Sequence, residues 1–180
     1  GSSFGVTPAL LGFWTKQGWV PARLSIQRGA SSGAHSLLML THLSPRGEDL
    51  LLKARGRFVA QFPYQLCDSL RGLDADLVCS LMKNAGPSGI EPDEADLADV
   101  RAFACGQRLL EVSIGSVWRW VCHTLMSSSR ASQLGKQELT LLVARVLQKH
   151  GWQECAQQTG VAGRAQAQAV LRGAIAKLIG

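Results

Sequence analysis

The sequence predicts an α+β fold, in which a strand–helix–strand–strand piece at the start of the chain is followed by an all-helical tail. Two patterns indicate this division. Apolar residues alternate with a period of two over residues 19–27, which is typical of a strand. From Ser44 onward they recur with the three- and four-residue spacing of amphipathic helices. With 180 residues, 46% of them hydrophobic, the chain can bury one core or two small ones.

Turn and cap residues set the limits of the elements in the first piece. Thr7 and Pro8 suit the cap and first turn of a helix, and Gly18 closes the same helix. The expected elements are strands over 2–6, 19–27 and 35–43, a helix over 9–17 and a turn over 29–33. The alternating residues expected on one face of the second strand are Val20, Ala22, Leu24 and Ile26. So small a sheet leaves edges and a face open, and we expect their cover upstream.

The tail is expected to be helical throughout, which divides the chain into domains over 1–45 and 46–180. Ser44 and Pro45 suit the start of its first helix, and Phe62-Pro63 is expected to break that helix, because proline has no backbone N–H to donate. The expected helices run over 44–60, 64–71, 74–84, 93–107, 109–126, 139–151, 152–158 and 163–178, with a polar linker over 127–132.

Composition excludes several classes of protein. The five cysteines are spread singly with no C-x-x-C pair, so neither a disulfide framework nor a metal site is expected. No apolar run approaches the ~18 residues that a membrane span needs. We therefore expect a soluble, cytoplasmic protein with reduced cysteines. Because the first residue is not methionine and no targeting pattern precedes Phe4, we also expect a fragment of a longer chain.

The net charge of +6 is divided into three blocks. Residues 1–57 carry seven Lys and Arg against two acids, residues 58–111 carry four against nine, and residues 112–180 carry eight against two. Two basic ends around an acidic middle suggest a polyanionic partner, and an ordinary solvated surface is the alternative. Arg46, Lys53 and Arg57 share one stripe of the first tail helix, since seven and eleven residues are close to two and three whole turns.

The stretch over 157–162 fits the pattern Q-x-x-G-x-A of a phosphate-binding loop. Such a loop leaves a strand and opens a helix, whereas the residues before this one are expected to be helical. A helix-turn-helix fits better, with Gly160 at the turn and Arg164 and Arg172 within one quadrant of the second helix, although Lys177 falls away from them. Simple packing of two small helices is the alternative.

The turn over 29–33 is rich in hydroxyl groups and free amides and follows Arg28, so it is a candidate phosphate or nucleotide site. An ordinary hairpin turn needs the same residues. No complete catalytic motif occurs anywhere in the sequence. Catalysis by this chain alone is therefore not expected, and no catalytic residue is assigned.

Three short runs follow one another in a specific order: Ser3-Phe4-Gly5, then Phe13-Trp14 with Gly18-Trp19, then Arg28-Gly29-Ala30-Ser31-Ser32-Gly33. The chain thereby resembles the tRNA(Met) cytidine acetyltransferase family, in which S-F-G, F-W, G-F and R-E-A-S-S-G occur in this order. The resemblance implies that residues 1–45 form the last part of a GNAT acetyltransferase fold. It also implies that the helical tail binds tRNA.

The resemblance further implies transfer of an acetyl group from acetyl-CoA to the N4 amine of the wobble cytidine of tRNA(Met), with ATP used by a helicase-like module absent from this chain. It places two acetyl-CoA contacts on Ala9 and Lys16, where the family has glutamate and arginine. Lys16 keeps the charge without the planar fork of arginine, and Ala9 cannot replace a carboxylate. The chain would supply one wall of the acetyl-CoA cleft and would be inactive by itself.

Arginine and lysine side chains held on helices can position a folded RNA through its phosphates. The residues expected to contact tRNA are Arg28 with Ser31, Ser32 and Gly33, the Arg46, Lys53 and Arg57 stripe, and Arg164 with Arg172. Two other functions stay open. One is a DNA-binding module built on the final helix pair, and the other is a structural domain whose basic ends contact an acidic protein.

Overall fold

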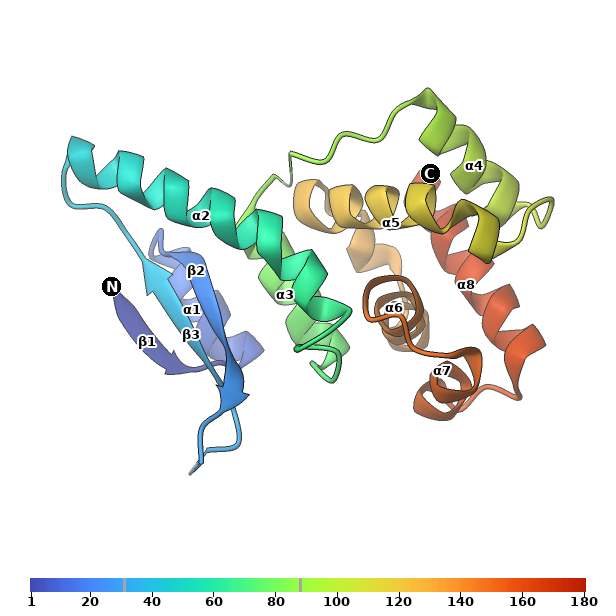
Figure 1. The fold of residues 1–180 in the computed structure, drawn as a ribbon, viewed down its shortest axis with the longest axis horizontal. Coiled ribbons are helices and arrows are strands. Elements are labelled where there is room, and N and C mark those ends of the chain that lie inside the picture. The colour runs from blue at the N-terminus through green and yellow to red at the C-terminus, as the bar shows by residue number, and fades with distance from the viewer. Residues whose placement is uncertain (31, 88) are drawn as a thin grey trace.

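A computed structural model describes residues 1–30, 32–87 and 89–180 and confirms the α+β class. The first piece contains β1 (Ser2–Gly5), α1 (Pro8–Lys16), β2 (Val20–Arg28) and β3 (His35–Leu40). The tail contains α2 (Pro45–Leu66), α3 (Ala75–Ala85), α4 (Glu94–Ala104), α5 (Leu110–Ser127), the 3-10 turn η1 (Arg130–Gln133), α6 (Lys136–Leu142), the π-helical turn η2 (Val143–Leu147), α7 (Trp152–Thr159) and α8 (Arg164–Ile179). The sheet lies at one end of the molecule and α4 to α8 at the other, with α2 and α3 between them (Figure 1).

The three strands form an antiparallel sheet in the order β1-β3-β2. On the central strand, Leu37 and Met39 are buried, whereas the alternate residues Ser36 and Leu38 face an open groove. Helix α1 packs on the buried face, where its Trp14 ring stacks on Phe4 of β1 at a centroid distance of 5.8 Å. One face of the sheet is thus covered by α1, and the other faces α2 across the groove.

The ends of α1 follow the expected cap chemistry. The Thr7 hydroxyl accepts a hydrogen bond from the backbone N–H of Leu10 at 3.2 Å, and Pro8 occupies the first turn. Gly18, just after the helix, has φ +77°, a left-handed conformation that glycine adopts without strain. The turn into β2 therefore depends on a glycine at this position.

The expected alternation along β2 is wrong, because the strand contains a bulge. Pro21 pairs with Met39 while Arg23 pairs with the next residue, Leu38, so one residue of β2 has no partner. The buried positions consequently become Pro21 and Leu24, three residues apart. Arg23 is exposed beside the groove, and Ile26, expected on the inward face, is 55% exposed.

Helix α2 continues through Phe62-Pro63 to Leu66, so the predicted break and the separate helix over 64–71 are both wrong. A proline inside a helix costs about 3 kcal/mol. Phe62 and Leu66 are both completely buried, however, and burial of each such side chain contributes roughly 1.5–3 kcal/mol. These two side chains offset the cost of Pro63, which is buried beside them.

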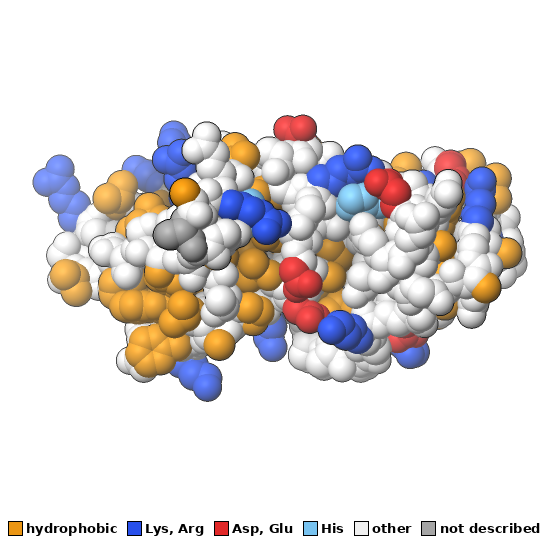
Figure 2. Space-filling model, turned by 90° about the horizontal axis from the view of Figure 1, so that it is seen from below, with side chains coloured by type: hydrophobic (Ala, Val, Ile, Leu, Met, Phe, Trp, Pro, Cys, Tyr) orange, Lys and Arg blue, Asp and Glu red, His pale blue; other side chains and the backbone are white. Residues whose placement is uncertain are grey.

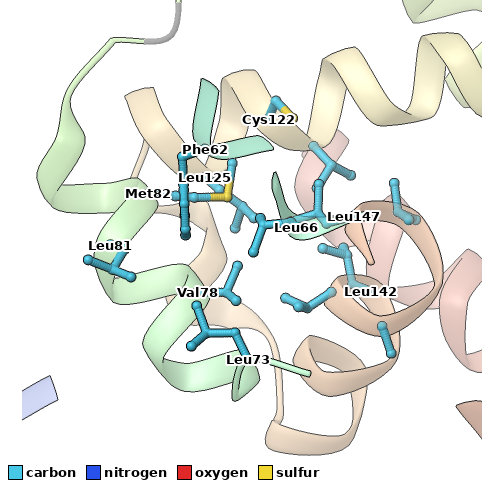
Figure 3. Packing of buried hydrophobic residues seen from close by; sticks show 14 of the residues in the cluster. Phe62, Leu66, Leu73, Val78, Leu81, Met82, Cys122, Leu125, Leu142 and Leu147 are labelled. Carbon is cyan, nitrogen blue, oxygen red and sulfur yellow. The ribbon is translucent and has the colours of Figure 1, made fainter. Parts of the chain in front are cut away.

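The buried side of α2 is part of one hydrophobic core shared with α3, α5, α6 and η2 (Figure 3). Phe62 and Leu66 lie among Val78 and Met82 of α3 and Leu125 of α5. Leu142 and Leu147 close the core on the far side. Helix α2 is therefore anchored in the helical part of the molecule, although its other side faces the sheet.

An ion pair joins α4 to α5. Asp96 accepts hydrogen bonds from two nitrogens of the Arg119 guanidinium, the Nε contact being 2.8 Å, while its backbone N–H and carboxylate complete a capping box with Asp93. The hydrogen bonds from Arg119 are the largest cause that lowers the pKa of Asp96 to about 2. The carboxylate is buried, so its charge depends on this partner.

All five cysteines are free thiols, two of them buried and two exposed. Burial raises the pKa of the buried Cys122 thiol to about 12 and that of Cys155 to about 11, which makes both unreactive near neutral pH. In the part of the chain that the structure describes, no helix is both long and apolar enough to cross a bilayer. The same residues contain no group of three or more side chains that could hold a metal ion.

We predict that Asp96→Asn lowers the free energy of unfolding by about 2 kcal/mol at about pH 7, because Arg119 loses its charged partner across the α4–α5 contact. The pKa of Asp96 is lower in the folded than in the unfolded chain, so this stabilisation is present above about pH 4 and is lost as the pH falls toward 2. Urea unfolding at several pH values measures it, with Glu94→Gln on the same helix as control. If the free energies of unfolding of wild type and Asp96→Asn differ by the same amount at every pH, the ionised Asp96 carboxylate is not the source of the stabilisation.

Candidate nucleic-acid interface

A groove of about 1520 Å³ lies between α2 and the open face of the sheet. The sheet contributes Ser3, Ser36, Leu38, Leu40 and most of β2, so the floor combines hydroxyl groups and aliphatic side chains. Helix α2 contributes the opposite wall. The residues of α2 that line it are Leu50, Lys53, Ala54, Gly56, Arg57, Phe58, Ala60, Gln61 and Gln65.

Three cations line this groove, and no acidic residue does. Lys53 and Arg57 come from α2 and Arg23 from β2, and all three are exposed. Among the described residues none of them forms an ion pair. Unpaired charges of one sign along a groove produce a positive potential that attracts a polyanion. The groove can therefore hold a phosphate backbone against its cations.

The predicted RNA contacts at Arg46, Arg28, Ser32 and Gly33 lie outside the groove. Arg46 is exposed in the first turn of α2, on the same stripe as Lys53 and Arg57 but toward the helix N-terminus. Arg28 follows Gln27, which lines the groove, and its guanidinium donates to the carbonyl oxygen of Gly33 at 3.5 Å. The Ser32 hydroxyl accepts from the backbone N–H of Ala34, and Ser31 lies outside the described residues.

The two predicted contacts on α8 each interact with a residue of another helix. Arg172 lies over the Phe103 ring of α4 at 5.6 Å, a cation–π contact, and its Nε is buried. Arg164 is 63% exposed and lies 3.7 Å from Glu111 of α5. The third cation of the helix, Lys177, donates to Glu138 at 2.8 Å. The basic side chains of α8 thus connect helices, and this geometry does not favour a DNA-recognition helix.

A smaller hollow of about 750 Å³ lies at the turn between α7 and α8, beside Arg164. The Glu111 carboxylate already accepts a hydrogen bond from Trp152 Nε1 at 3.2 Å and lies 3.7 Å from Arg145 as well as from Arg164. The stretch over 157–162 begins inside α7, which ends at Thr159, and no strand precedes it, so the setting of a phosphate-binding loop is missing as expected. The groove, whose cations are free, is therefore the stronger candidate site.

Ala9 and Lys16 lie on α1, which covers the opposite face of the sheet from the groove. Both are exposed, and their seven-residue spacing places them on the same side of the helix, two turns apart. Lys16 forms no ion pair with a described residue, so its ammonium is available to an anionic ligand. Ala9 has no side-chain group that can hydrogen-bond. Of the two predicted coenzyme contacts, only Lys16 therefore has a side chain that can bind a phosphate group.

The structure adds Arg23 to the site, a residue that the sequence did not single out. Its alternation with Leu24 suggested only an ordinary outward-facing strand residue. Arg23 lies opposite the buried Leu24 and pairs with Leu38, which lines the groove, so it belongs to the site only because α2 forms the opposite wall. In the sequence, only the excess of Lys and Arg over acids in residues 1–57 indicates that this end of the molecule carries further basic side chains.

The fold is that of a small antiparallel sheet with a helical tail, and its first part is acetyltransferase-like: residues 1–44 match the family described as GNAT acetyltransferase 2. Over nearly its full length the chain is similar to three proteins named tRNA(Met) cytidine acetyltransferase TmcA. The relative from Nitrosococcus halophilus is 44% identical over 180 residues, which cover 99% of this chain and 24% of the relative. The relative from Vibrio cholerae is 31% identical over 182 residues, which cover 99% of this chain and 23% of the relative. The relative from Haloferax volcanii is 34% identical over 160 residues, which cover 88% of this chain and 21% of the relative.

The resemblance seen in the sequence is therefore confirmed: the chain is related to the tRNA(Met) cytidine acetyltransferases and corresponds to a part of them. It spans about a quarter of the length of the curated relatives it matches. The similarity extends beyond the acetyltransferase-like residues into the helical tail, because the family match ends at residue 44 while the relatives align over almost the whole chain.

Several other arginines serve the fold, and Arg71 is the clearest example. Its Nε donates to the carbonyl oxygen of Gln148 at 3.0 Å and its Nη2 to that of Lys149 at 3.1 Å. Lys149 has φ +58°, unusual for a residue other than glycine, so this turn needs support from its neighbours. Arg71 thereby ties the turn after η2 to the segment that follows α2.

We predict that Arg71→Met lowers the free energy of unfolding by about 1–2 kcal/mol, because two backbone carbonyl groups lose their partner. Arg57→Met should change it by less than about 0.5 kcal/mol, since Arg57 is exposed and unpaired. Chemical denaturation of the two variants measures the difference. Equal destabilisation would mean that Arg57 has a structural role, and the groove would lose one of its free cations.

Proposed function

We propose that this chain is the C-terminal part of a tRNA cytidine acetyltransferase and that the groove between α2 and the sheet binds the RNA substrate. The observation that carries the proposal is the 44% identity over 99% of the chain to a protein named for that activity. The groove lined by Arg23, Lys53 and Arg57 supports the assignment of RNA binding to this surface. In this proposal the full-length protein acetylates the N4 amine of the wobble cytidine of tRNA(Met).

The groove would bind RNA through its backbone. Lysine and arginine contacts to phosphates position a folded RNA but do not distinguish bases, and they release counterions when they form. Arg23 comes from the acetyltransferase-like part and Lys53 and Arg57 from the tail. Bound RNA would therefore cross the proposed boundary between domains 1–45 and 46–180. Cytoplasmic location is consistent with this substrate and stays a prediction.

The coenzyme would lie on the other side of the sheet. We propose that Lys16 contacts a phosphate of acetyl-CoA, which supplies the acetyl group, while Ala9 makes no polar contact. Lys16 belongs to α1 and the RNA cations face the groove, so the phosphates of the coenzyme and of the RNA would be held on opposite faces of the sheet. Use of ATP is assigned to a part of the full-length protein outside this chain.

We predict that Arg23→Gln, Lys53→Gln and Arg57→Gln each weaken tRNA binding by the full-length protein and reduce the slope of log K against log salt by about 1, since each removes one phosphate contact. Electrophoretic mobility shift or anisotropy titrations at several salt concentrations measure both quantities. Lys136→Gln on α6, which removes an exposed charge elsewhere, is the matched control. If all four variants weaken binding equally, the cations of the groove contribute only through the net charge of the protein, and the groove is not the binding site. Stronger competition by duplex DNA than by tRNA would favour the DNA-binding alternative.

We predict that Lys16→Gln raises the KM for acetyl-CoA several-fold with little change in kcat, because a phosphate contact is the same in the ground state and the transition state. Lys16→Arg should restore the KM, since it keeps the charge. Steady-state kinetics with the full-length enzyme measure these values, with Gln17→Ala as control at the neighbouring exposed position. An unchanged KM in Lys16→Gln would remove this residue from the coenzyme site.

A further inference from the structure

An exposed tyrosine continues the basic stripe of α2. Arg46 and Tyr64 are eighteen residues apart, which is five whole turns of an α-helix, and Lys53 and Arg57 lie within about 20° of the same line. We call these four residues the α2 stripe. Tyr64 belongs to it only because α2 continues unbroken through Pro63 to Leu66.

Tyr64 is unusually exposed for an aromatic side chain, with 68% of its surface accessible. Its ring contacts that of Trp118 on α5 at a centroid distance of 5.9 Å and an angle of 42°. Trp118 is half-buried and packs against the hydrophobic core. The tyrosine ring is thus supported by a fixed neighbour while much of it stays open to solvent.

Arg57 and Tyr64 are close enough to serve one ligand. Seven residues of helix correspond to about 10 Å, and the Gln61 and Gln65 side chains that line the groove flank Tyr64 on the same helix. An unpaired cation next to an open aromatic ring suits a ligand that carries both an anion and a flat π-surface. A nucleotide has both, whereas an acidic peptide would use the cation alone.

We propose that Tyr64, supported by Trp118, is a stacking platform for an unpaired base of the RNA, whose phosphates contact Arg57 and Lys53. This proposal rests on the proposed function of the groove and adds a base contact to a site otherwise built from phosphate contacts. Stacking of a base on an aromatic side chain contributes about 1–3 kcal/mol and accepts any base. The platform therefore selects RNA with an exposed base over a fully paired helix.

The test uses the full-length protein and a short unstructured RNA that carries the fluorescent base 2-aminopurine. Tyr64→Ala should weaken binding roughly ten-fold and abolish the quenching of the fluorescent base. Tyr64→Phe keeps a ring and should bind as the wild type does. Leu52→Ala is the matched control, because Leu52 is a 56% exposed side chain of the same helix outside the stripe. Tyr64→Leu, which keeps an apolar contact for Trp118, gives a second variant without a stacking ring.

The outcomes separate this proposal from the function on which it rests. If Lys53→Gln and Arg57→Gln weaken binding while Tyr64→Ala and Tyr64→Leu bind normally, the stacking platform is refuted and the groove is not. If none of these variants changes RNA binding, the proposed function fails as well. Binding of polyglutamate as tight as that of RNA, unaffected by Tyr64→Ala, would identify the surface as a site for an acidic protein and would overturn the proposal.

Discussion

Helix α2 has two sides that must meet opposite requirements, and the arrangement of the other elements follows from that division. Phe62 and Leu66 lie on the side that packs into the core, and they hold the helix against α3 and its neighbours. Lys53 and Arg57 lie on the side that faces the sheet across the groove. Since a helix turns by a fixed angle per residue, the position of the apolar side chains also determines the direction of the cations. The continuity of the helix through Pro63 extends this relation to Tyr64.

The second constraint is the incomplete cover of the sheet. Helix α1 buries one face through Trp14, while Ser36 and Leu38 on the other face stay open to the groove. Figure 2 shows hydrophobic side chains gathered over the end of the molecule that carries the sheet, where Phe13 is among the exposed apolar residues. This end of the molecule thus leaves apolar side chains exposed to solvent. The helical end is different, because its arginines and acids are largely paired with one another, as Asp96 is with Arg119.

Much of this fold could be predicted from the sequence, because caps and periodicity are local properties. Thr7, Gly18 and Ser44 mark element ends where the structure has them, and the stripe of Lys53 and Arg57 followed from helical spacing alone. Tertiary effects account for the errors. Burial of the residues around Pro63 outweighed its local cost, and the bulge in β2 shifted the buried positions to Pro21 and Leu24. Periodicity placed Arg172 near Arg164 on α8, but it contained no information that Phe103 would cover Arg172.

In the proposed function, RNA lies between α2 and the open face of the sheet. Hydrogen–deuterium exchange of the full-length protein with and without tRNA tests this placement of the RNA. Slower exchange of a backbone segment means that bound tRNA shields its amides from solvent or reduces its local unfolding. Bound tRNA should slow exchange in β2 and along α2, including the turn that contains Tyr64, and should leave exchange in α7 and α8 unchanged. Protection confined to α7 and α8, with β2 and α2 exchanging as fast as in the free protein, would contradict this placement.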